Sequence, residues 1–267
     1  MLPTFLIVGA MKCGTTSLYH YLAEHPEISM SRVKETNFFI VERNHSRGLE
    51  WYESLFAGPA KACGEASPNY SKHWLFRGVP ERIHAVLPQA RLIYLVRDPI
   101  DRMISHYKHR LAQGTEKRPL REALTDRQRN PYLLSSRYYE SIAPFLRYYL
   151  RENILILTSE QLRHERQATL SRVFEFLNVN PAFIGPGAAK VWHRSDKKLA
   201  KRQGRLGRLL NSRWLRIMNP RHWQVAGPAA LPEKCDHDLQ NQLIERLRPD
   251  IDRFRQWTGG QYPEWSL

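Results

Sequence analysis

Three short apolar runs recur along the chain, at 5–8, 92–96 and 154–158, and each precedes a segment of helical periodicity. Apolar runs without alternation are typical of parallel strands that are covered on both faces. Two weaker segments, 28–30 and 64–67, are consistent with further short strands. Strands that alternate with helices predict a doubly wound α/β domain, whose ligands bind at the carboxyl ends of the strands.

The helices are predicted from apolar residues at helical spacing. Asp98 is in a position to cap the helix that follows the second run, with Pro99 in its first turn. We expect the other helices between the first run and His25, and at 81–87, 138–150, 170–177 and 239–257. The polar segments 41–63 and 115–131 are predicted to be irregular loops.

The chain has 267 residues, of which 42% are hydrophobic, and this suffices for one large domain that spans residues 1–267. Lys and Arg number 41 against 26 Asp and Glu, which gives a formal net charge of +15. Eleven of these bases and a single acid, Asp196, lie between Lys190 and Arg221. The surplus predicts an anionic partner, and it leaves open a nucleotide, a nucleic acid, an acidic polysaccharide or a membrane surface.

Three scattered cysteines, Cys13, Cys63 and Cys235, form no CxxC pair and are too few for a disulfide scaffold. They predict a reducing compartment. The first apolar run has no basic leader, and Lys12 interrupts it well before the length of a membrane span. We therefore expect a soluble, cytoplasmic protein that starts at Met1 and has no transmembrane segment.

The segment between the first apolar run and the first helix has the composition of a phosphate-binding loop. Gly9 and Gly14 have the spacing of the Walker A pattern GxxxxGK[ST], but Lys12 lies between them instead of after the second glycine. Backbone N–H groups and the helix dipole attract phosphate oxygens, the hydroxyls of Thr15 and Thr16 can donate, and the lysine adds positive charge. The segment predicts an anion site; the alternative is a glycine-containing turn without a ligand.

KxGTT after an apolar strand, together with LVRDPIDRMISHY at 95–107, resembles the two nucleotide-binding signatures of the sulfotransferase superfamily. HPEI, KETNFF, GLEWY, EASPNY and PERI occur in the order seen in the heparan-sulfate sulfotransferase branch and its bacterial relatives, and RPDIDRFRQWTGGQYPEW resembles the ending of the bacterial members. The resemblance covers nearly the whole chain. It implies a single domain with the P-loop-like sulfotransferase fold, in which helices flank a mainly parallel central sheet. It also implies 3'-phosphoadenosine 5'-phosphosulfate (PAPS) as the sulfuryl donor, with no metal required.

The resemblance assigns roles to the residues that match the family motifs. Lys12, inside the loop, is suited to stabilise the leaving 5'-phosphate, and Glu35 in KETNFF is implied to be the general base that takes the acceptor's proton. The other implied nucleotide-binding residues are Cys13, Gly14, Thr15, Thr16 and Ser17 in the loop, Arg97 and Ser105 at the 3'-phosphate, Tyr138, and Lys197 and Lys198. The last two belong to a basic segment, 190–222, that is expected partly to cover the nucleotide.

Two positions depart from the heparan-sulfate branch, whose members often have a histidine in place of Asn37 and a lysine in place of Ala66. Both positions are near the acceptor in those enzymes, so the acceptor of this chain is expected to differ. A small molecule, a lipid and a glycan all remain open, and so does the choice between a hydroxyl and an amine.

Several ionisable residues have a structural interpretation beside the functional one. Glu35 could simply pair with Lys34 or Arg32 on a solvated loop. Glu65 could be a second site carboxylate or half of a structural salt bridge. The remaining candidates are His73, His106 and His109 as alternative bases and Arg102 as a second ligand of the 3'-phosphate.

Two other functions are compatible with parts of the sequence. A P-loop kinase or NTPase would need Mg²⁺ and an acid to hold it, and Asp98 is the strand-end acid available, in a position that reads as a helix cap. A non-enzymatic module that binds a polyanion would explain the positive charge. No recognised nucleic-acid motif accompanies that charge, so we predict no nucleic-acid partner. The oligomeric state stays open.

Overall fold

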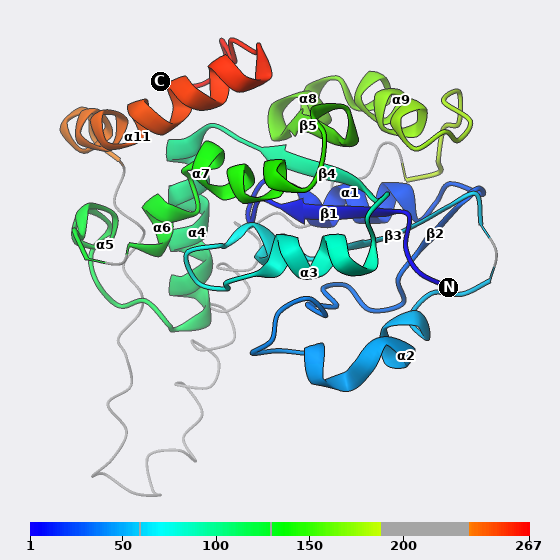
Figure 1. The fold of residues 1–267 in the computed structure, drawn as a ribbon. Helices are drawn as coiled ribbons and strands as arrows, with labels where there is room; N and C mark the ends of the chain where they lie inside the picture. Colours follow the sequence, from blue (N-terminus) through cyan, green and yellow to red (C-terminus); the bar gives the residue numbers. More distant parts are fainter. Residues whose placement is uncertain (59, 129, 188–234) are drawn as a thin grey trace, which may run out of the picture.

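The structure is a computed structural model that describes residues 1–58, 60–128, 130–187 and 235–267 (Figure 1). Within these residues one sheet has the strand order β2-β3-β1-β4-β5. All neighbouring strands are parallel. The strands are β1 (Phe5–Gly9), β2 (Ile28–Met30), β3 (Ala62–Ala66), β4 (Arg91–Val96) and β5 (Ile154–Thr158). The predicted fold class, a parallel sheet flanked by helices, is confirmed.

The strand order brings the predicted motifs to one edge of the sheet. β1 lies at the centre, between β3 and β4, and it is in register with both, Phe5 opposite Gly64 on one side and Arg91 on the other. Because the strands run in the same direction, their carboxyl ends meet at a single edge. The loops that leave this edge after β1, β2, β3 and β4 carry the phosphate loop, KETNFF, SPNYSK and RDP in turn.

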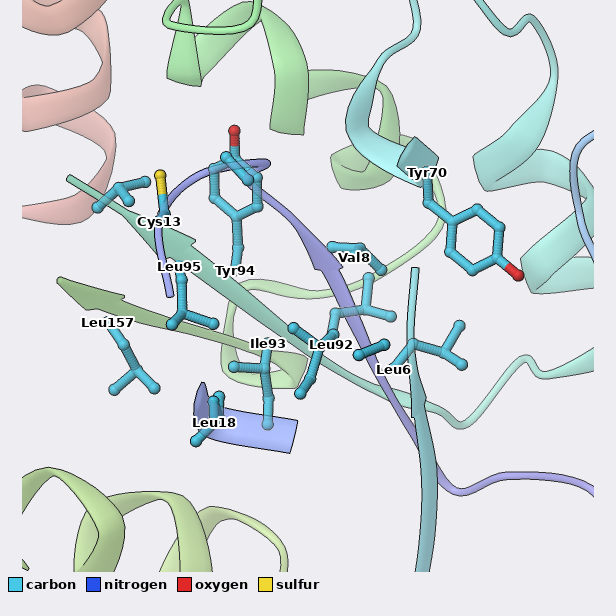
Figure 2. Packing of buried hydrophobic residues seen from close by; sticks show 14 of the residues in the cluster. Leu6, Val8, Cys13, Leu18, Tyr70, Leu92, Ile93, Tyr94, Leu95 and Leu157 are labelled. Carbon is cyan, nitrogen blue, oxygen red and sulfur yellow. The ribbon is translucent and has the colours of Figure 1, made fainter. Parts of the chain in front are cut away.

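Helices cover both faces of the sheet (Figure 1). In the close view of the core, Ile93 and Leu95 of β4 point toward Leu18 of α1, and Tyr94 points to the opposite face (Figure 2). This alternation is that of a strand buried on both sides. The longer helices are α1 (Thr15–Leu22), α3 (Val79–Val86), α4 (Pro99–Gln113), α9 (Arg166–Phe176) and α11 (His237–Thr258). The shorter ones are α2 (Gly48–Glu53), α5 (Leu120–Thr125), α6 (Pro131–Leu134), α7 (Tyr138–Ile142) and α8 (Ser159–His164).

The structure corrects three sequence predictions. The segment 138–150 is not one helix: α7 ends at Ile142 and a 3-10 turn (Ala143–Arg147) follows. Pro144 explains the break, because it has no N–H to donate and its ring crowds the preceding turn. The segments 41–63 and 115–131 are not irregular throughout, since they contain α2 and α5. In α5 the apolar residues are buried at helical spacing, but the stretch is only six residues long.

The C-terminal ending packs against the same edge of the sheet. Asp250 of α11 accepts hydrogen bonds from the backbone N–H groups of Tyr139 (3.1 Å) and Glu140 (2.9 Å), and it thereby caps α7. Ser266 donates its backbone N–H to Asp98 at the start of α4, 2.5 Å away. The ending that resembles those of bacterial members therefore supports the elements on which the RDP motif lies.

All three cysteines are unpaired, Cys13 and Cys63 being buried. As for membranes, the helices in the described ranges include none with an apolar stretch long enough to cross a bilayer.

Candidate active site

The phosphate loop follows β1 and ends at the first turn of α1. At Gly9 a side chain is excluded, because an added Cβ would lie 2.4 Å from Oγ of Ser71 and 2.5 Å from the ring of Tyr94. Lys12 has a φ of 73° and Gly14 a φ of 96°, so the loop passes twice through the left-handed region. Gly14 is the N-cap of α1 and has no side chain to cap the first-turn N–H groups. This geometry favours an anion at the helix N-terminus.

The side chains of the loop divide into buried and partly exposed ones. Cys13 and Thr15 are buried, and Lys12, Thr16 and Ser17 are partly exposed. Burial raises the pKa of the Cys13 thiol to about 11, so this thiol is neutral near pH 7. The backbone N–H of Cys13 donates to the carbonyl of Ala10 at 3.2 Å, so this residue contributes to the shape of the loop.

Tyr138 connects the phosphate loop with the end of β4. Its hydroxyl donates to the carbonyl of Arg97 (2.7 Å), accepts from the N–H of the same residue (3.2 Å) and lies 3.7 Å from Sγ of Cys13. The Tyr138 side chain has no exposed surface. In this structure Tyr138 therefore holds the backbone at Arg97 in place, rather than presenting its ring to a ligand.

Arg97 lies between β4 and α4, and Ser105 lies within α4. The guanidinium of Arg97 is 18% exposed and pairs with Asp101 at 2.5 Å. Within the described part of the chain its buried Nε has no hydrogen-bond partner, so this group retains a donor for a ligand. Asp98 is the N-cap of α4, as predicted, and accepts from the N–H of Asp101 at 2.8 Å. With its oxygens engaged in backbone hydrogen bonds, Asp98 has the role of a cap.

Arg102 is a buried support of the phosphate loop. It is fully buried and donates to the carbonyls of Met11 (3.4 Å) and Tyr132 (2.5 Å) and to Oγ of Ser136 (2.6 Å). Its guanidinium thus joins the loop to the segment at the start of α7. His106 lies 3.5 Å from Arg102, and burial, followed by the charge of Arg102, holds its pKa well below the usual range.

Glu35 lies in the loop after β2, where its φ is 24° and that of Asn37 is 49°. Its carboxylate is 40% exposed, with Oε1 3.4 Å from Nζ of Lys34. Oε2 accepts from the amide of Asn69 at 3.5 Å, and the same amide donates to Oδ1 of Asn37 at 3.0 Å. Arg32 instead donates to the carbonyl of Ser54. Glu35 therefore pairs with Lys34, as in the structural interpretation, and its carboxylate is also partly exposed beside Asn69 of the SPNYSK loop, as a general base requires.

Glu65 is a buried hydrogen-bond acceptor, and within the described ranges it forms no salt bridge. It is fully buried in β3, and four hydroxyl groups donate to it. Burial raises the pKa of its carboxyl, and these hydrogen bonds oppose the shift. The donors are Tyr52 and Tyr70 at 2.8 Å and Thr36 and Ser67 at 2.6 Å. Because Thr36 is adjacent to Glu35, this cluster fixes the loop that carries the predicted base.

We expect Glu65→Ala to lower the free energy of unfolding by about 3 kcal/mol, because four buried hydroxyls lose their acceptor and a cavity remains. Urea denaturation would measure the change. Glu152→Ala is the matched control, since Glu152 is exposed in a 3-10 turn (Arg151–Asn153), and it should stay within about 0.5 kcal/mol of the unaltered protein. Equal stability of the two variants would contradict the assigned role of Glu65.

Lys72 is a candidate site residue that the sequence analysis did not single out. It directly follows the 3-10 turn Pro68–Ser71 at the end of β3. Its Nζ donates to Oδ1 of Asn69 at 2.7 Å and to Sδ of Met11 at 3.1 Å. Burial lowers its pKa to about 8. The available signal was its place in a loop at the carboxyl edge, two residues after the end of the EASPNY motif.

Residues 2–202 match the family model described as "Sulfotransferase domain". The chain belongs to the sulfotransferase family. A solved structure, a sulfotransferase from Alicyclobacillus acidocaldarius, superposes on it with a TM-score of 0.76 over 100% of both chains at 22% identity. This likeness supports the sulfotransferase fold.

Curated relatives of this sulfotransferase include two enzymes named for heparan sulfate. The human bifunctional heparan sulfate N-deacetylase/N-sulfotransferase 2 is 30% identical over an alignment of 203 residues that covers 67% of this chain and 22% of the relative. The mouse heparan sulfate glucosamine 3-O-sulfotransferase 3B1 is 31% identical over 188 residues, 67% of this chain and 46% of the relative. The chain therefore spans less than half the length of these relatives.

The predicted site residues of the sulfotransferase are only partly within the described ranges. The loop residues, Glu35 and Arg97 follow neighbouring strands at one edge, and Ser105 lies within α4. The buried Tyr138 contacts Arg97 and Cys13. Lys197, Lys198 and the remainder of the basic segment 190–222 lie outside the described residues.

Proposed function

We propose that this sulfotransferase moves a sulfuryl group from PAPS to a hydroxyl or amine of an acceptor. The observation that carries the proposal is a chain of contacts at the carboxyl edge. Met11 of the phosphate loop contacts Lys72, Lys72 contacts Asn69, and the Asn69 amide contacts Glu35. A loop suited to an anion and a carboxylate suited to take a proton are thereby held next to one another.

The nucleotide is held, in this proposal, by groups at the ends of β1 and β4. The N–H groups of the loop from Gly14 onward and the hydroxyls of Thr15, Thr16 and Ser17 bind the 5'-phosphate at the N-terminus of α1. Arg97 and Ser105 bind the 3'-phosphate. The buried Nε of Arg97 has no hydrogen-bond partner among residues 1–58, 60–128, 130–187 and 235–267, and this supports the assignment, because a phosphate oxygen would satisfy that donor.

The transfer is an in-line displacement at sulfur. The bond between sulfur and the bridging oxygen breaks, and that oxygen keeps the electron pair as part of the 5'-phosphate. A new bond forms between sulfur and the acceptor atom, whose proton passes to Glu35. Lys12 stabilises the negative charge on the bridging oxygen as it leaves. Catalysis of this kind depends on positioning and on charge stabilisation. Tyr138, Arg102 and Glu65 contribute to positioning, because they hold the loops that carry the reacting groups.

The acceptor is proposed to be a hydroxyl- or amine-bearing molecule, with glycans as the first class to test. The names of the curated relatives refer to heparan sulfate, which supports a glycan. Asn37 and Ala66 stand where the resembling enzymes often have histidine and lysine, so heparan sulfate itself is not assumed. Small-molecule and lipid acceptors belong to the same screen.

The test is transfer of labelled sulfate from PAPS to a panel of N-desulfated heparin, other glycans, lipids and small alcohols and amines. We expect a labelled product whose formation is unaffected by a metal chelator. A parallel assay with ATP and Mg²⁺ should give no phosphorylated product. Phosphoryl transfer that the chelator abolishes would contradict the proposal and favour the kinase alternative.

A further inference from the structure

Lys72 lies between the phosphate loop and the loop that carries Glu35. Its ammonium donates to Sδ of Met11 at 3.1 Å, and Met11 directly precedes Lys12 in the phosphate loop. It also donates to Oδ1 of Asn69 at 2.7 Å, and the amide of that residue reaches Glu35 at 3.5 Å. The ammonium is therefore the positive group that joins the two halves of the site.

The surroundings of this ammonium do not balance its charge. Its two hydrogen-bond partners among the described residues, a thioether and an amide oxygen, are both neutral. Among the charged and titratable groups that face it, Glu35 favours the charged form, whereas Arg102, Arg43 and Arg110 disfavour it, and His106 of α4 is close by. Burial is the largest cause of the lowered pKa of Lys72, which is about 8. A partly buried cation among other cations is stabilised when an anion arrives.

We propose that Lys72 binds the sulfuryl oxygens of PAPS and stabilises the charge that they carry during transfer. The inference rests on the proposed function, in which the sulfuryl group moves from the phosphate loop toward an acceptor atom whose proton goes to Glu35. Lys72 contacts the loop at the start of this path through Met11 and is linked to Glu35 at its end through Asn69. The two lysines then have separate roles: Lys12 stabilises the bridging oxygen that leaves, and Lys72 stabilises the three oxygens that travel with sulfur. Lys72 makes no covalent bond in this step.

The test compares the binding of PAPS with that of its desulfated product, 3'-phosphoadenosine 5'-phosphate (PAP), by calorimetry. Lys72→Met keeps an unbranched side chain of similar length and removes the charge. We expect its Kd for PAPS to rise about tenfold or more, because charge-assisted hydrogen bonds to the sulfuryl oxygens are lost. Its Kd for PAP should stay within about twofold, because PAP has no sulfuryl group. Lys72→Arg should recover most of the PAPS affinity.

Lys61→Met is the matched control, because Lys61 is exposed and precedes β3 at the opposite edge of the sheet. A pH series adds a second measurement. In the unaltered protein, PAPS affinity should decline as the pH rises through about 8, because the Lys72 ammonium then loses its proton. Lys72→Arg should remove this decline, since a guanidinium stays protonated in that range.

Three results would overturn the inference. If Lys72→Met weakens PAPS and PAP equally, Lys72 acts on the phosphate loop and not on the sulfuryl group. If it weakens neither while the unaltered protein binds both, Lys72 has no part in nucleotide recognition. If the unaltered protein binds neither nucleotide, the proposed function itself is wrong, and the inference falls with it.

Discussion

Lys12→Ala is expected to lower the rate of sulfuryl transfer about 100- to 1,000-fold at saturating PAPS. The physical reason is the position of Lys12 inside the phosphate loop. Lys12 itself has a left-handed backbone conformation, which curves the loop at this point. A lysine behind the loop, as in Walker A, would meet terminal phosphate oxygens. From within the loop the ammonium can meet the bridging oxygen, on which negative charge develops as the bond to sulfur breaks.

The measurement separates this role from binding and from folding. Alanine, like lysine, is strained at a φ of 73°, so the substitution removes the charge without adding a new backbone conflict. We expect PAP affinity to fall less than the rate does, and thermal stability to change little. Lys61→Ala provides the control for loss of a lysine elsewhere on the surface. A variant that loses affinity for PAP by the same factor as it loses rate would show that Lys12 binds the nucleotide without assisting the departure of the leaving group.

Much of the fold could be predicted because its strands are buried on both faces. The run at β4 is apolar from Leu92 to Val96, and such a stretch identifies a central parallel strand without knowledge of its neighbours. The run at β5 is recognisable in the same way. The short helices were harder to predict from the sequence. For example, α5 packs against α4 and α11, and a six-residue pattern does not reveal these contacts.

The sequence could locate candidate positions where they directly follow the end of a strand. Gly9, Lys12 and Arg97 belong to this class, since the topology brings strand ends to one edge. The supporting groups could not be predicted, because their roles depend on contacts between distant segments. Glu65 acquires its role from hydroxyls on three separate segments, and Lys72 acquires its role from Met11, which is 61 positions away. The sequence around a single lysine or glutamate does not indicate such contacts.

Glu35→Gln is expected to lower the rate of transfer about 100- to 10,000-fold while PAPS affinity stays within about twofold. Glutamine keeps the size of the side chain, and its Oε1 can still accept from the amide of Asn69, so the loop should keep its shape. What is lost is the capacity to take a proton from the acceptor. Initial rates at saturating PAPS, with calorimetry for the nucleotide, separate the two effects, and Glu152→Gln controls for loss of an exposed carboxylate.

A smaller variant distinguishes a proton acceptor from a loop residue that merely pairs with Lys34. In Glu35→Ala the space of the carboxylate is vacated beside Asn69, and the Glu35 carboxylate is already 40% exposed in the unaltered protein, so a small carboxylate such as formate can enter from solvent. If Glu35 is the base, added formate should restore part of the lost rate, in proportion to its concentration, and chloride at equal ionic strength should not. A pairing role gives the opposite result: Glu35→Gln would retain the full rate, since the supports through Thr36 and Asn37 remain intact. The two substitutions together therefore test the proton transfer itself, independently of the identity of the acceptor.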